Sequence, residues 1–515
     1  GTNQDLMGEN VFCTSLAGEE LGRMKSWGKS PESRAEHRLT SPGFMNDLPQ
    51  TFMEPLLFKT ACSRGTEPRL STEYLSHEEK EGRVFTTCLD KLSGKEFIIN
   101  SKYLIGADGG NSQVAENAKL PFKGQMGVAG SINILIEADL TRFVSHRPSV
   151  LYWVLQPGAD VGGIGMGVVR MVRPWNEWLL IWGYDINEGA PQISDDFAIK
   201  VARDLIGDPD QDVKVKSVST WTVNNMYAEK MRNGNVFCLG DATHRHPPSN
   251  GLGSNTSIQD SFNLAWKIAH VLQGKAEEKL LNSFEQERAP IAKQIVTRAN
   301  QSIEEFGPIF QALGLTDTND PKKMKENMSK RLKNDEEGQD TRRKLREAIA
   351  FKNYEFDAHG VDMNHRYYSD AIVNDGQKEP AFKKDKELHF EQTSWPGARL
   401  PHAWVFNKSG KQISTLDLAG KGCFSIFTGL NGSKWVGAAE KVSSKFNITI
   451  LINVIGPGSS IEDYTGDWAR IREINDGGAL LVRPDHHICA RFFTDSETAF
   501  DDLERVFSKI LGSVN

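Results

Sequence analysis

One stretch restricts the fold of this chain more than any other: Asn235–Gly274, NVFCLGDATHRHPPSNGLGSNTSIQDSFNLAWKIAHVLQG. A short apolar run, VFCL, leads into Gly240 and Asp241, and a loop rich in Pro, Gly and Asn then leads into a segment with helical spacing. Open α/β sheets bind ligands at the carboxyl ends of their strands. The stretch therefore predicts an α/β fold with a ligand site at this strand-to-helix turn.

The residue types in the turn indicate what it binds. Asp241 can accept hydrogen bonds from sugar or ribityl hydroxyls, and Gly240 permits a close approach of the backbone. We expect a helix from about Asn255 to Leu272, capped by Ser254 or Asn255. Its predicted apolar face consists of Ile258, Phe262, Ala265 and Ala269. Free N–H groups at the helix start favour an electron-rich group such as a reduced flavin ring. An ordinary capped strand-loop-helix is the alternative.

A second, shorter motif has the same form. YLIGADGGNSQV, Tyr103–Val114, is a strand that runs into Asp108 and Gly109 and continues as a polar turn. Alone it is weak evidence, because Asp-Gly is a common turn pair. RVFTTCLD and KEFIIN, on either side of LSGK, predict a hairpin before it. Between the two motifs, SINILIEADL, SVLYWVLQPG, GMGVVRMV, EWLLIWGYDI and VKSVSTWTV predict an aromatic-rich β block.

The rest of the chain is mixed. Leu280–Leu313 is helical in pattern, and the charged segment Asp317–Asp340 predicts a solvated helix or a mobile segment. Thr393–Trp404, TSWPGARLPHAW, has the prolines and glycine of a linker. Beyond it, the apolar runs CFSIFTGL, ITILINVIG and GALLVRPDHHICARF and the amphipathic segment ETAFDDLERVFSKILG predict a smaller α/β domain.

Length and composition exclude several classes of protein. A chain of 515 residues is expected to form more than one domain, and 38% hydrophobic with 25% charged residues suits a soluble globular protein. A net charge of -7 argues against nucleic acid or an anionic membrane as a partner. No apolar run is long enough to span a membrane, and the first residues do not form a signal peptide, so we expect a cytoplasmic protein. The six cysteines lack a CxxC pair and the histidines lack zinc spacing, which predicts free thiols and no metal site.

Together, in this order and around the aromatic β block, the two motifs resemble the flavoprotein aromatic hydroxylases, the single-component FAD monooxygenases of the p-hydroxybenzoate hydroxylase class. GDATHRHPPSNGLGSNTSIQDSFNLAWK is most similar to the branch that contains phenol 2-monooxygenase and 2,4-dichlorophenol 6-monooxygenase. The resemblance extends through DLPQTFMEPLL, RPSVLYWVLQPG, VVRMVRPWNEWLLIWGYD and STWTVNNMYA, and covers nearly the whole chain. It implies an α/β (α+β) fold with a three-layer FAD-binding domain, an inserted β-sheet substrate domain and a C-terminal thioredoxin-like domain.

The resemblance implies five segments. Residues 1–125 and 221–300 would form two parts of the FAD-binding domain, 126–220 the β-rich substrate domain, 301–395 its helical extension and a linker, and 396–515 the thioredoxin-like domain. The last segment has no CxxC pair and Cys423 stands alone in it, which favours packing or dimerisation over a redox role. A homodimer is the expected assembly.

The resemblance also implies the cofactor site. Asp241 would bind the FAD ribityl chain, Gln50 would reach the ribityl or phosphate region, and Asp108 would lie near FAD and the approach of NAD(P)H. Pro248, Gly253, Ser254 and Asn255 would border the flavin ring, the last two through backbone N–H groups. The expected cofactor-binding residues are Gln50, Asp108, Gly240, Asp241, Pro248, Gly253, Ser254 and Asn255. Ala115 stands where the family often has an Arg after the Asp-Gly turn, which leaves the nicotinamide contact open.

The implied reaction uses NADPH or NADH and O2 to form a flavin C4a-hydroperoxide, which hydroxylates a phenolic substrate next to its hydroxyl group. This chemistry requires a dry pocket and gains from deprotonation of the phenol. The residues assigned to the reaction centre are His246, Pro248 and Tyr227. His246 could equally be a structural histidine.

Two further groups of residues have open interpretations. Arg170 and Arg173 either contact substrate or nicotinamide or are solvated charges at a strand end. The Trp- and Tyr-rich block from Tyr152 to Tyr184 either walls an apolar substrate pocket or fills a sheet core.

One expected motif is missing. The family opens with a βαβ unit whose GxGxxG turn holds the FAD pyrophosphate. GGIGMGVV from Gly162 and GPGSSI from Gly456 are near matches, and neither follows the required strand–turn–helix order. We expect a chain that starts late, with a protein that has lost FAD binding as the alternative. The alternative functions are a same-fold flavin enzyme that tailors a quinone or polyketide, and an inactive flavin-free fragment.

Overall fold

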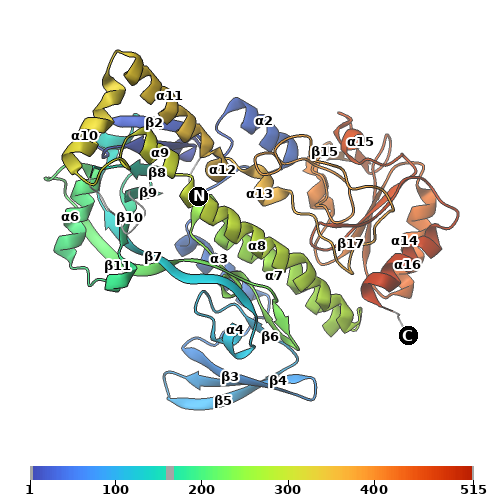
Figure 1. The fold of residues 1–515 in the computed structure, drawn as a ribbon. Coiled ribbons are helices and arrows are strands. Elements are labelled where there is room, and N and C mark those ends of the chain that lie inside the picture. The colour runs from blue at the N-terminus through green and yellow to red at the C-terminus, as the bar shows by residue number, and fades with distance from the viewer. Residues whose placement is uncertain (1–3, 158–166, 513–515) are drawn as a thin grey trace.

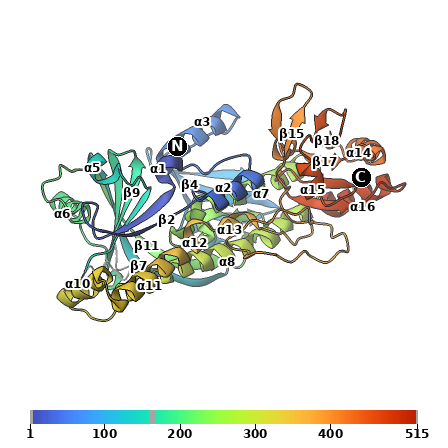
Figure 2. The same cartoon turned by 90° about the horizontal axis from the view of Figure 1, so that it is seen from above.

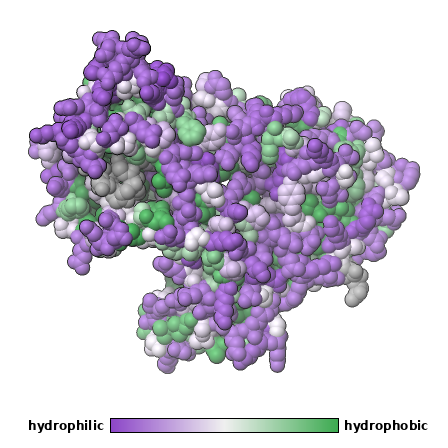
Figure 3. Space-filling model, viewed as in Figure 1, coloured by the Kyte–Doolittle hydropathy of each residue, from purple (hydrophilic) through white to green (hydrophobic). Residues whose placement is uncertain are grey.

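The computed structural model describes residues 4–157 and 167–512. An eight-stranded sheet occupies one end of the molecule, two long helices cross its middle, and a smaller α/β domain forms the other end (Figures 1 and 2). The face drawn in Figure 3 is largely hydrophilic, with small apolar areas. Within the described ranges, no helix combines the length and apolar character needed to cross a bilayer.

The large sheet has the strand order β14-β11-β7-β10-β9-β8-β1-β2. Its strands are β1 (Glu9–Cys13), β2 (Glu20–Lys25), β7 (Phe122–Glu137), β8 (Leu151–Val154), β9 (Gly167–Arg173), β10 (Glu177–Tyr184), β11 (Lys214–Ala228) and β14 (His244–Arg245). The β block predicted from the sequence is confirmed in β7 to β11. Of the near match GGIGMGVV, residues 162–166 lie outside the described residues.

Strands β1 and β2 join the large sheet at its far edge. β1 pairs in parallel with β8, from Asn10 opposite Leu151 to Cys13 opposite Val154. This pairing is non-local, and the apolar strand ENVFC buries both of its faces, one in the sheet core and one beneath a helical layer. No local pattern encodes such a partner.

Side chains alternate between the two faces of the sheet. On β10, Trp178 and Leu180 are buried in the core that α6 (Asp195–Ile206) covers, whereas Leu179 and Ile181 face a cavity. The end of the sheet that contains β1 and β2 is covered by α9 (Gly307–Ala312), α10 (Pro321–Ser329) and α11 (Glu336–Phe351). Two short helices follow in the chain, α12 (Asn353–Phe356) and α13 (His359–Met363). The charged segment at 317–340 is therefore mainly helical.

Both motifs end at the same edge of a small sheet. β6 (Leu104–Gly106) runs parallel to β13 (Val236–Cys238), which also pairs with β12 (Arg232–Asn233). Because parallel strands end on the same side, the turns after Gly106 and Cys238 lie next to each other. The antiparallel strands β3 (Thr72–Lys80), β4 (Arg83–Asp90) and β5 (Lys95–Ser101) form a separate sheet, in which the predicted LSGK hairpin is confirmed.

Helix α7 (Leu252–Leu272) lies beside α8 (Asn282–Glu304) (Figure 1). The sequence prediction for α7 was wrong in two respects. The helix begins three residues early, after Gly251 in a left-handed conformation, and has no side-chain cap. The predicted apolar face is also not the buried one: Ile258 and Phe262 are both 48% exposed, whereas Asp260, Asn263 and Lys267 are buried. Partners on α8 and in the C-terminal domain explain this inversion.

The C-terminal domain has a sheet with the order β18-β17-β20-β21, in which β17 runs parallel to β18 and antiparallel to β20. Its elements are β15 (Trp404–Asn407), β16 (Gln412–Ser414), β17 (Phe424–Thr428), α14 (Ser433–Lys445), β18 (Ile450–Val454), β19 (Ile461–Glu462), α15 (Asp467–Ile471), β20 (Ala479–Val482), β21 (Ile488–Phe492) and α16 (Ala499–Leu511). Trp266 of α7 packs edge-on against Phe424 of β17, with ring centroids 5.7 Å apart. One apolar core therefore joins this domain to the long helices.

The predicted linker at Thr393–Trp404 is not a solvated linker. Trp395 is 2% exposed, and Gly397 donates its N–H to the carbonyl of Ile488 at 2.7 Å. The segment is buried because its backbone pairs with the C-terminal domain, which Pro and Gly content does not reveal. The remaining α-helices are α1 (Gln4–Met7), α2 (Pro31–Thr40), α3 (Gln50–Ser63), α4 (Gln113–Asn117) and α5 (Thr141–Val144).

Candidate cofactor and active site

A cavity of about 1900 Å³ lies between the large sheet and the two Asp-containing turns. Most of the residues predicted for the site line this one cavity: Gln50, Gly240, Asp241, His246, Pro248, Gly253, Ser254 and Asn255. They come from segments about 200 residues apart in the sequence, at the start of α3 and from β13 to α7. The tertiary structure therefore brings together residues that the sequence only suggested as a group.

The turn after β13 is held in a conformation that requires glycine. Gly240 has φ 64°, and a Cβ at this position would lie 2.9 Å from the Ser257 Oγ on α7. The carbonyl of Gly240 accepts the N–H of Thr243 at 2.7 Å, which closes a 3-10 turn over Gly240–Ala242. Asp241 is exposed at the tip of this turn and lines the cavity. Its carboxylate is thus free to accept hydrogen bonds there.

The start of α7 opens onto the same cavity. Pro248 to Asn255 all line it, and among the described residues no side chain caps the helix. A Cβ at Gly251 would meet nothing within 4 Å, so the backbone here borders open space. Uncapped N–H groups and the positive end of the helix dipole favour an anionic or electron-rich ligand group at this position.

The second turn contributes backbone rather than its carboxylate. Ala107, Gly109, Gly110 and Asn111 line the cavity, and Asp108 is not among the lining residues. The Asp108 carboxylate accepts the Ser112 hydroxyl at 2.5 Å and the Val114 N–H at 3.1 Å, and so holds the start of α4. In this geometry both oxygens of the Asp108 carboxylate accept hydrogen bonds from its own turn. A contact between Asp108 and a cofactor stays a prediction.

His246 has the geometry of a hydrogen-bond acceptor in the cavity. Its Nδ1 lies 2.7 Å from the Pro247 carbonyl, which can only accept, so Nδ1 carries the proton. Burial lowers the pKa of His246 to about 4, so the ring is neutral at neutral pH. Its Nε2 therefore presents a lone pair, and this buried atom has no hydrogen-bond partner in the described part of the chain. A ligand hydroxyl could donate to it.

Tyr227 lies elsewhere. It pairs with His244 in the β11–β14 ladder and packs against the core that joins α7 and α8 to the C-terminal domain. It is not among the residues that line the cavity. Its predicted role in the reaction therefore has no support from its position.

The Trp- and Tyr-rich block from Tyr152 to Tyr184 contributes both to the core of the sheet and to the wall of the cavity. Tyr152 and Trp178 are fully buried in the sheet core, whereas Trp153, Trp182 and Tyr184 line the cavity. The two-residue period separates Tyr152 from its neighbour Trp153 on β8, whereas Trp182 and Tyr184 share the parity of Trp178 on β10 and also pack against the sheet core.

The two candidate arginines also line the cavity, and each has a partner on the opposite wall. Arg170 pairs with Asp47 at 2.8 Å, and the Arg173 guanidinium lies 4.6 Å from the centroid of the Phe52 ring. They link the large sheet to the start of α3.

Sequence reasoning missed two carboxylates. Asp47 lines the cavity, and its Oδ2 is buried without a hydrogen-bond partner in the described ranges. Its position directly before the LPQ of DLPQTFMEPLL was the available signal. Asp260 is fully buried behind the Gly240 turn. It falls on the face of α7 that the helical pattern assigned to solvent, so no sequence signal identified it.

These features fit a flavin. An extended polar group can lie along the turn that carries Asp241, a planar ring can lie against the backbone at the start of α7, and His246 lines the same cavity. In the described residues, no group of three His, Cys, Asp or Glu side chains could hold a metal ion, and the cysteines are unpaired.

Comparison with known families gives two matches. Residues 1–299 match the FAD binding domain family, and residues 393–514 match the family described as aromatic-ring hydroxylase, C-terminal. The second match begins at Thr393, within the buried segment that pairs with the C-terminal domain.

Individual proteins are similar over almost the whole chain. A 2,4-dichlorophenol 6-monooxygenase from Cupriavidus pinatubonensis is 54% identical, over 99% of this chain and 85% of its own length. A phenol 2-monooxygenase from Pseudomonas sp. strain EST1001 is 46% identical, over 97% of this chain and 81% of its own length. The crystal structure of the flavin-dependent monooxygenase PieE, in complex with FAD and substrate, superposes with a TM-score of 0.93 at 37% identity, over 99% of this chain and 87% of that one.

Proposed function

This chain belongs to the FAD-dependent aromatic-ring hydroxylases, and from this premise we propose that it hydroxylates a phenol next to its hydroxyl group, using NAD(P)H and O2. The observation that carries the proposal is the shared cavity, in which the Asp241 turn, the uncapped start of α7 and the neutral His246 meet an aromatic wall. Neither a quinone- or polyketide-tailoring enzyme nor an inactive fragment is favoured by the relatives at 46–54% identity.

We assign cofactor binding to the chain's own groups as follows. Asp241 accepts hydrogen bonds from the ribityl hydroxyls, and Gln50 contacts the ribityl or phosphate region. The N–H groups of Ser254 and Asn255 lie against the ring, where the helix dipole stabilises negative charge. FAD, once reduced by NAD(P)H, supplies the activation of O2 that no protein side chain provides.

His246 is assigned the ionisation of the substrate. Because Nδ1–H is committed to the Pro247 carbonyl, Nε2 can accept a hydrogen bond from a phenolic hydroxyl and draw its proton away from the oxygen. A phenolate is more electron-rich than a phenol, so the ring carbon next to the oxygen reacts more readily. Because burial holds the pKa of His246 near 4, the ring can polarise the phenolic O–H through this hydrogen bond but is a weak base for complete proton transfer.

The aromatic wall is assigned the exclusion of water. Leu179, Ile181 and Trp182 present apolar surface to the cavity, and the Trp221 indole is tied to Asn133 at 3.1 Å. A dry, apolar site suits a phenol ring and protects reactive intermediates from hydrolysis. We further propose a cytoplasmic homodimer.

The purified protein tests the function directly. We expect bound FAD, NAD(P)H oxidation that depends on added phenol, and one atom of ¹⁸O from ¹⁸O2 in the catechol product. An equal rate of NAD(P)H oxidation without phenol, with peroxide as the only product, would contradict phenol hydroxylation. Omission of phenol and replacement of phenol by benzene are the matched controls.

A further inference from the structure

Asp260 is a buried carboxylate directly behind the turn that carries Asp241. It lies on α7, is 0% exposed, and has no place in the mechanism above. Its Oδ2 accepts the backbone N–H of Gly240 at 3.1 Å and the Nε2–H of His244 at 2.9 Å. One oxygen atom thus bonds the backbone directly before Asp241 and the side chain of His244 after it.

The other oxygen of Asp260 is held by Arg288. The Arg288 Nε donates to Oδ1 at 2.6 Å, and both side chains are fully buried. Burial alone would raise the pKa of Asp260, but the charge of Arg288 and the bond from His244 lower it overall. The carboxylate is therefore ionised, and an ionised acceptor makes stronger hydrogen bonds to the turn than a neutral one would.

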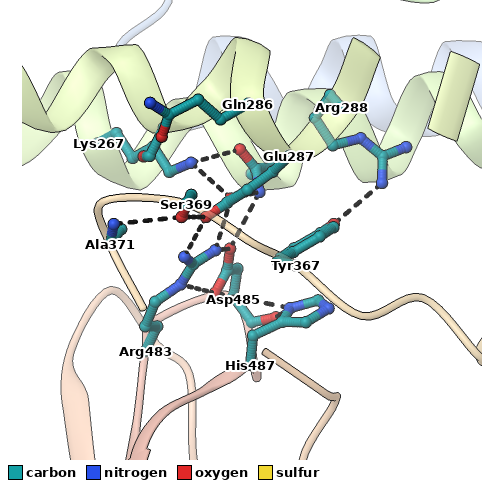
Figure 4. A network of polar contacts seen from close by, with 12 residues as sticks. Lys267, Gln286, Glu287, Arg288, Tyr367, Ser369, Ala371, Arg483, Asp485 and His487 are labelled. Atoms are coloured by element: carbon teal, nitrogen blue, oxygen red, sulfur yellow. Dashed lines mark hydrogen bonds and ion pairs between the residues drawn. The ribbon is translucent and has the colours of Figure 1, made fainter. Parts of the chain in front are cut away.

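Arg288 is in turn anchored to the C-terminal domain. Its Nη1 donates to the hydroxyl of Tyr367 at 2.9 Å, and the Tyr367 ring stacks on His487 with centroids 4.1 Å apart. Figure 4 shows this contact beside a second cluster, in which Arg483 approaches Glu287. A continuous line of buried contacts thus runs from the Gly240 turn to the C-terminal domain.

We propose that Asp260 is a positioning residue for the cofactor: clamped by Arg288, it fixes the Gly240–His244 turn so that Asp241 meets the ribityl chain. The inference rests on the proposed role of Asp241. Hydrogen bonds within the turn, such as that from the Thr243 N–H to the Gly240 carbonyl, set its local shape, and Asp260 ties the turn to α7. The same geometry explains why a charged face of α7 is buried.

The test compares Asp260→Asn with Glu287→Gln. Asparagine cannot accept from Gly240, His244 and Arg288 at once, because its amide places a donor against one of these donors. Glu287 is equally buried in the neighbouring cluster but does not touch the turn. We expect both variants to lower the melting temperature, but only D260N to raise the FAD Kd, by about tenfold or more.

Hydrogen–deuterium exchange supplies a second readout that does not require FAD. In D260N the peptide covering 240–244 should exchange faster, with no such change in E287Q. If D260N does not fold, His244→Gln removes one of the bonds to Asp260 and is measured in the same way. An unchanged FAD Kd and unchanged exchange at 240–244 would reduce Asp260 to a stability role. The Asp241→Ala variant separates the two proposals, since wild-type FAD affinity in D241A would overturn the role of Asp241 itself.

Discussion

Arg483 of the C-terminal domain and Glu287 of helix α8 form a bidentate ion pair at 2.5 and 2.9 Å, and both side chains are 0% exposed. Lys267 bonds the same glutamate at 2.8 Å, and Asp485 bonds the same arginine (Figure 4). Two cations and two anions therefore compensate each other in a dry interior. The cluster ties the C-terminal domain to the helix pair that borders the cofactor cavity.

Breaking this pair should destabilise the protein strongly. Arg483→Gln leaves Glu287 with one cation fewer, and removal of one partner from a buried pair costs about 3–5 kcal/mol. The double variant E287Q/R483Q should cost less than the sum of the two single variants, by about 1–3 kcal/mol. Urea unfolding of the four proteins measures this coupling. If the losses in unfolding free energy of the two single variants simply add in the double variant, the two groups do not interact. The control is Lys445→Gln, which breaks a surface ion pair with Glu504.

Removal of the Asp241 carboxylate should weaken FAD binding without unfolding the turn. Asp241 lies at the exposed tip, and its side chain is not needed for the Gly240–Thr243 hydrogen bond. Loss of hydrogen bonds to a charged acceptor should raise the Kd for FAD by about 10–100-fold. Titration of apoprotein with FAD, followed by flavin fluorescence, measures the change. Asp210→Ala, at an exposed loop position, should bind FAD normally.

Replacement of His246 by Gln should lower kcat/KM for phenol by about tenfold near neutral pH, because the hydrogen bond from the phenolic hydroxyl to Nε2 is lost. The loss should be much smaller for a phenol whose own pKa lies below the assay pH, since that substrate arrives ionised. Steady-state kinetics with the two phenols gives the comparison. An equal loss with both would indicate a structural histidine. His77→Gln, on the remote strand β3, is the control.

Several buried histidines should make the fold sensitive to acid. Burial lowers the pKa of His37, His246 and His402 to about 4 and that of His365 to about 3. Below the usual pKa of about 6.5 the unfolded chain binds protons that the folded chain excludes, so stability is full above pH 6.5 and falls towards pH 4. Burial raises the pKa of Asp362 to about 6 and also raises the pKa values of Glu355 and Asp357, and these carboxyl groups act in the opposite direction.

The melting temperature between pH 7.5 and 4.5 measures this effect. His402→Gln should flatten the slope by removing one of the four groups, even if it lowers stability at every pH. A melting temperature that does not fall across this range would show that the histidines are not held neutral by the fold.

The residue pattern alone determined much of this protein. Alternating β-branched and aromatic residues predicted β7 to β11, and the strand–Gly–Asp–loop–helix pattern located the Gly240 turn, because these signals are local and depend only on period and turn chemistry. The resemblance of the same motifs to flavin hydroxylases anticipated the family that the comparisons show.

Only the tertiary structure decided which faces are buried and which distant segments meet. The apolar stripe of α7 at Ile258 and Phe262 remains exposed, while Asp260 and Lys267 are buried, because their charges find partners on α8 and in the C-terminal domain. A single charged residue is expected at the surface from its own hydration, and its burial depends on a partner of opposite charge far away in the sequence. The pairing of β1 with β8 and the burial of Trp395 could not be predicted from the sequence for the same reason. Partners far away in the sequence, and not local patterns, determine these contacts.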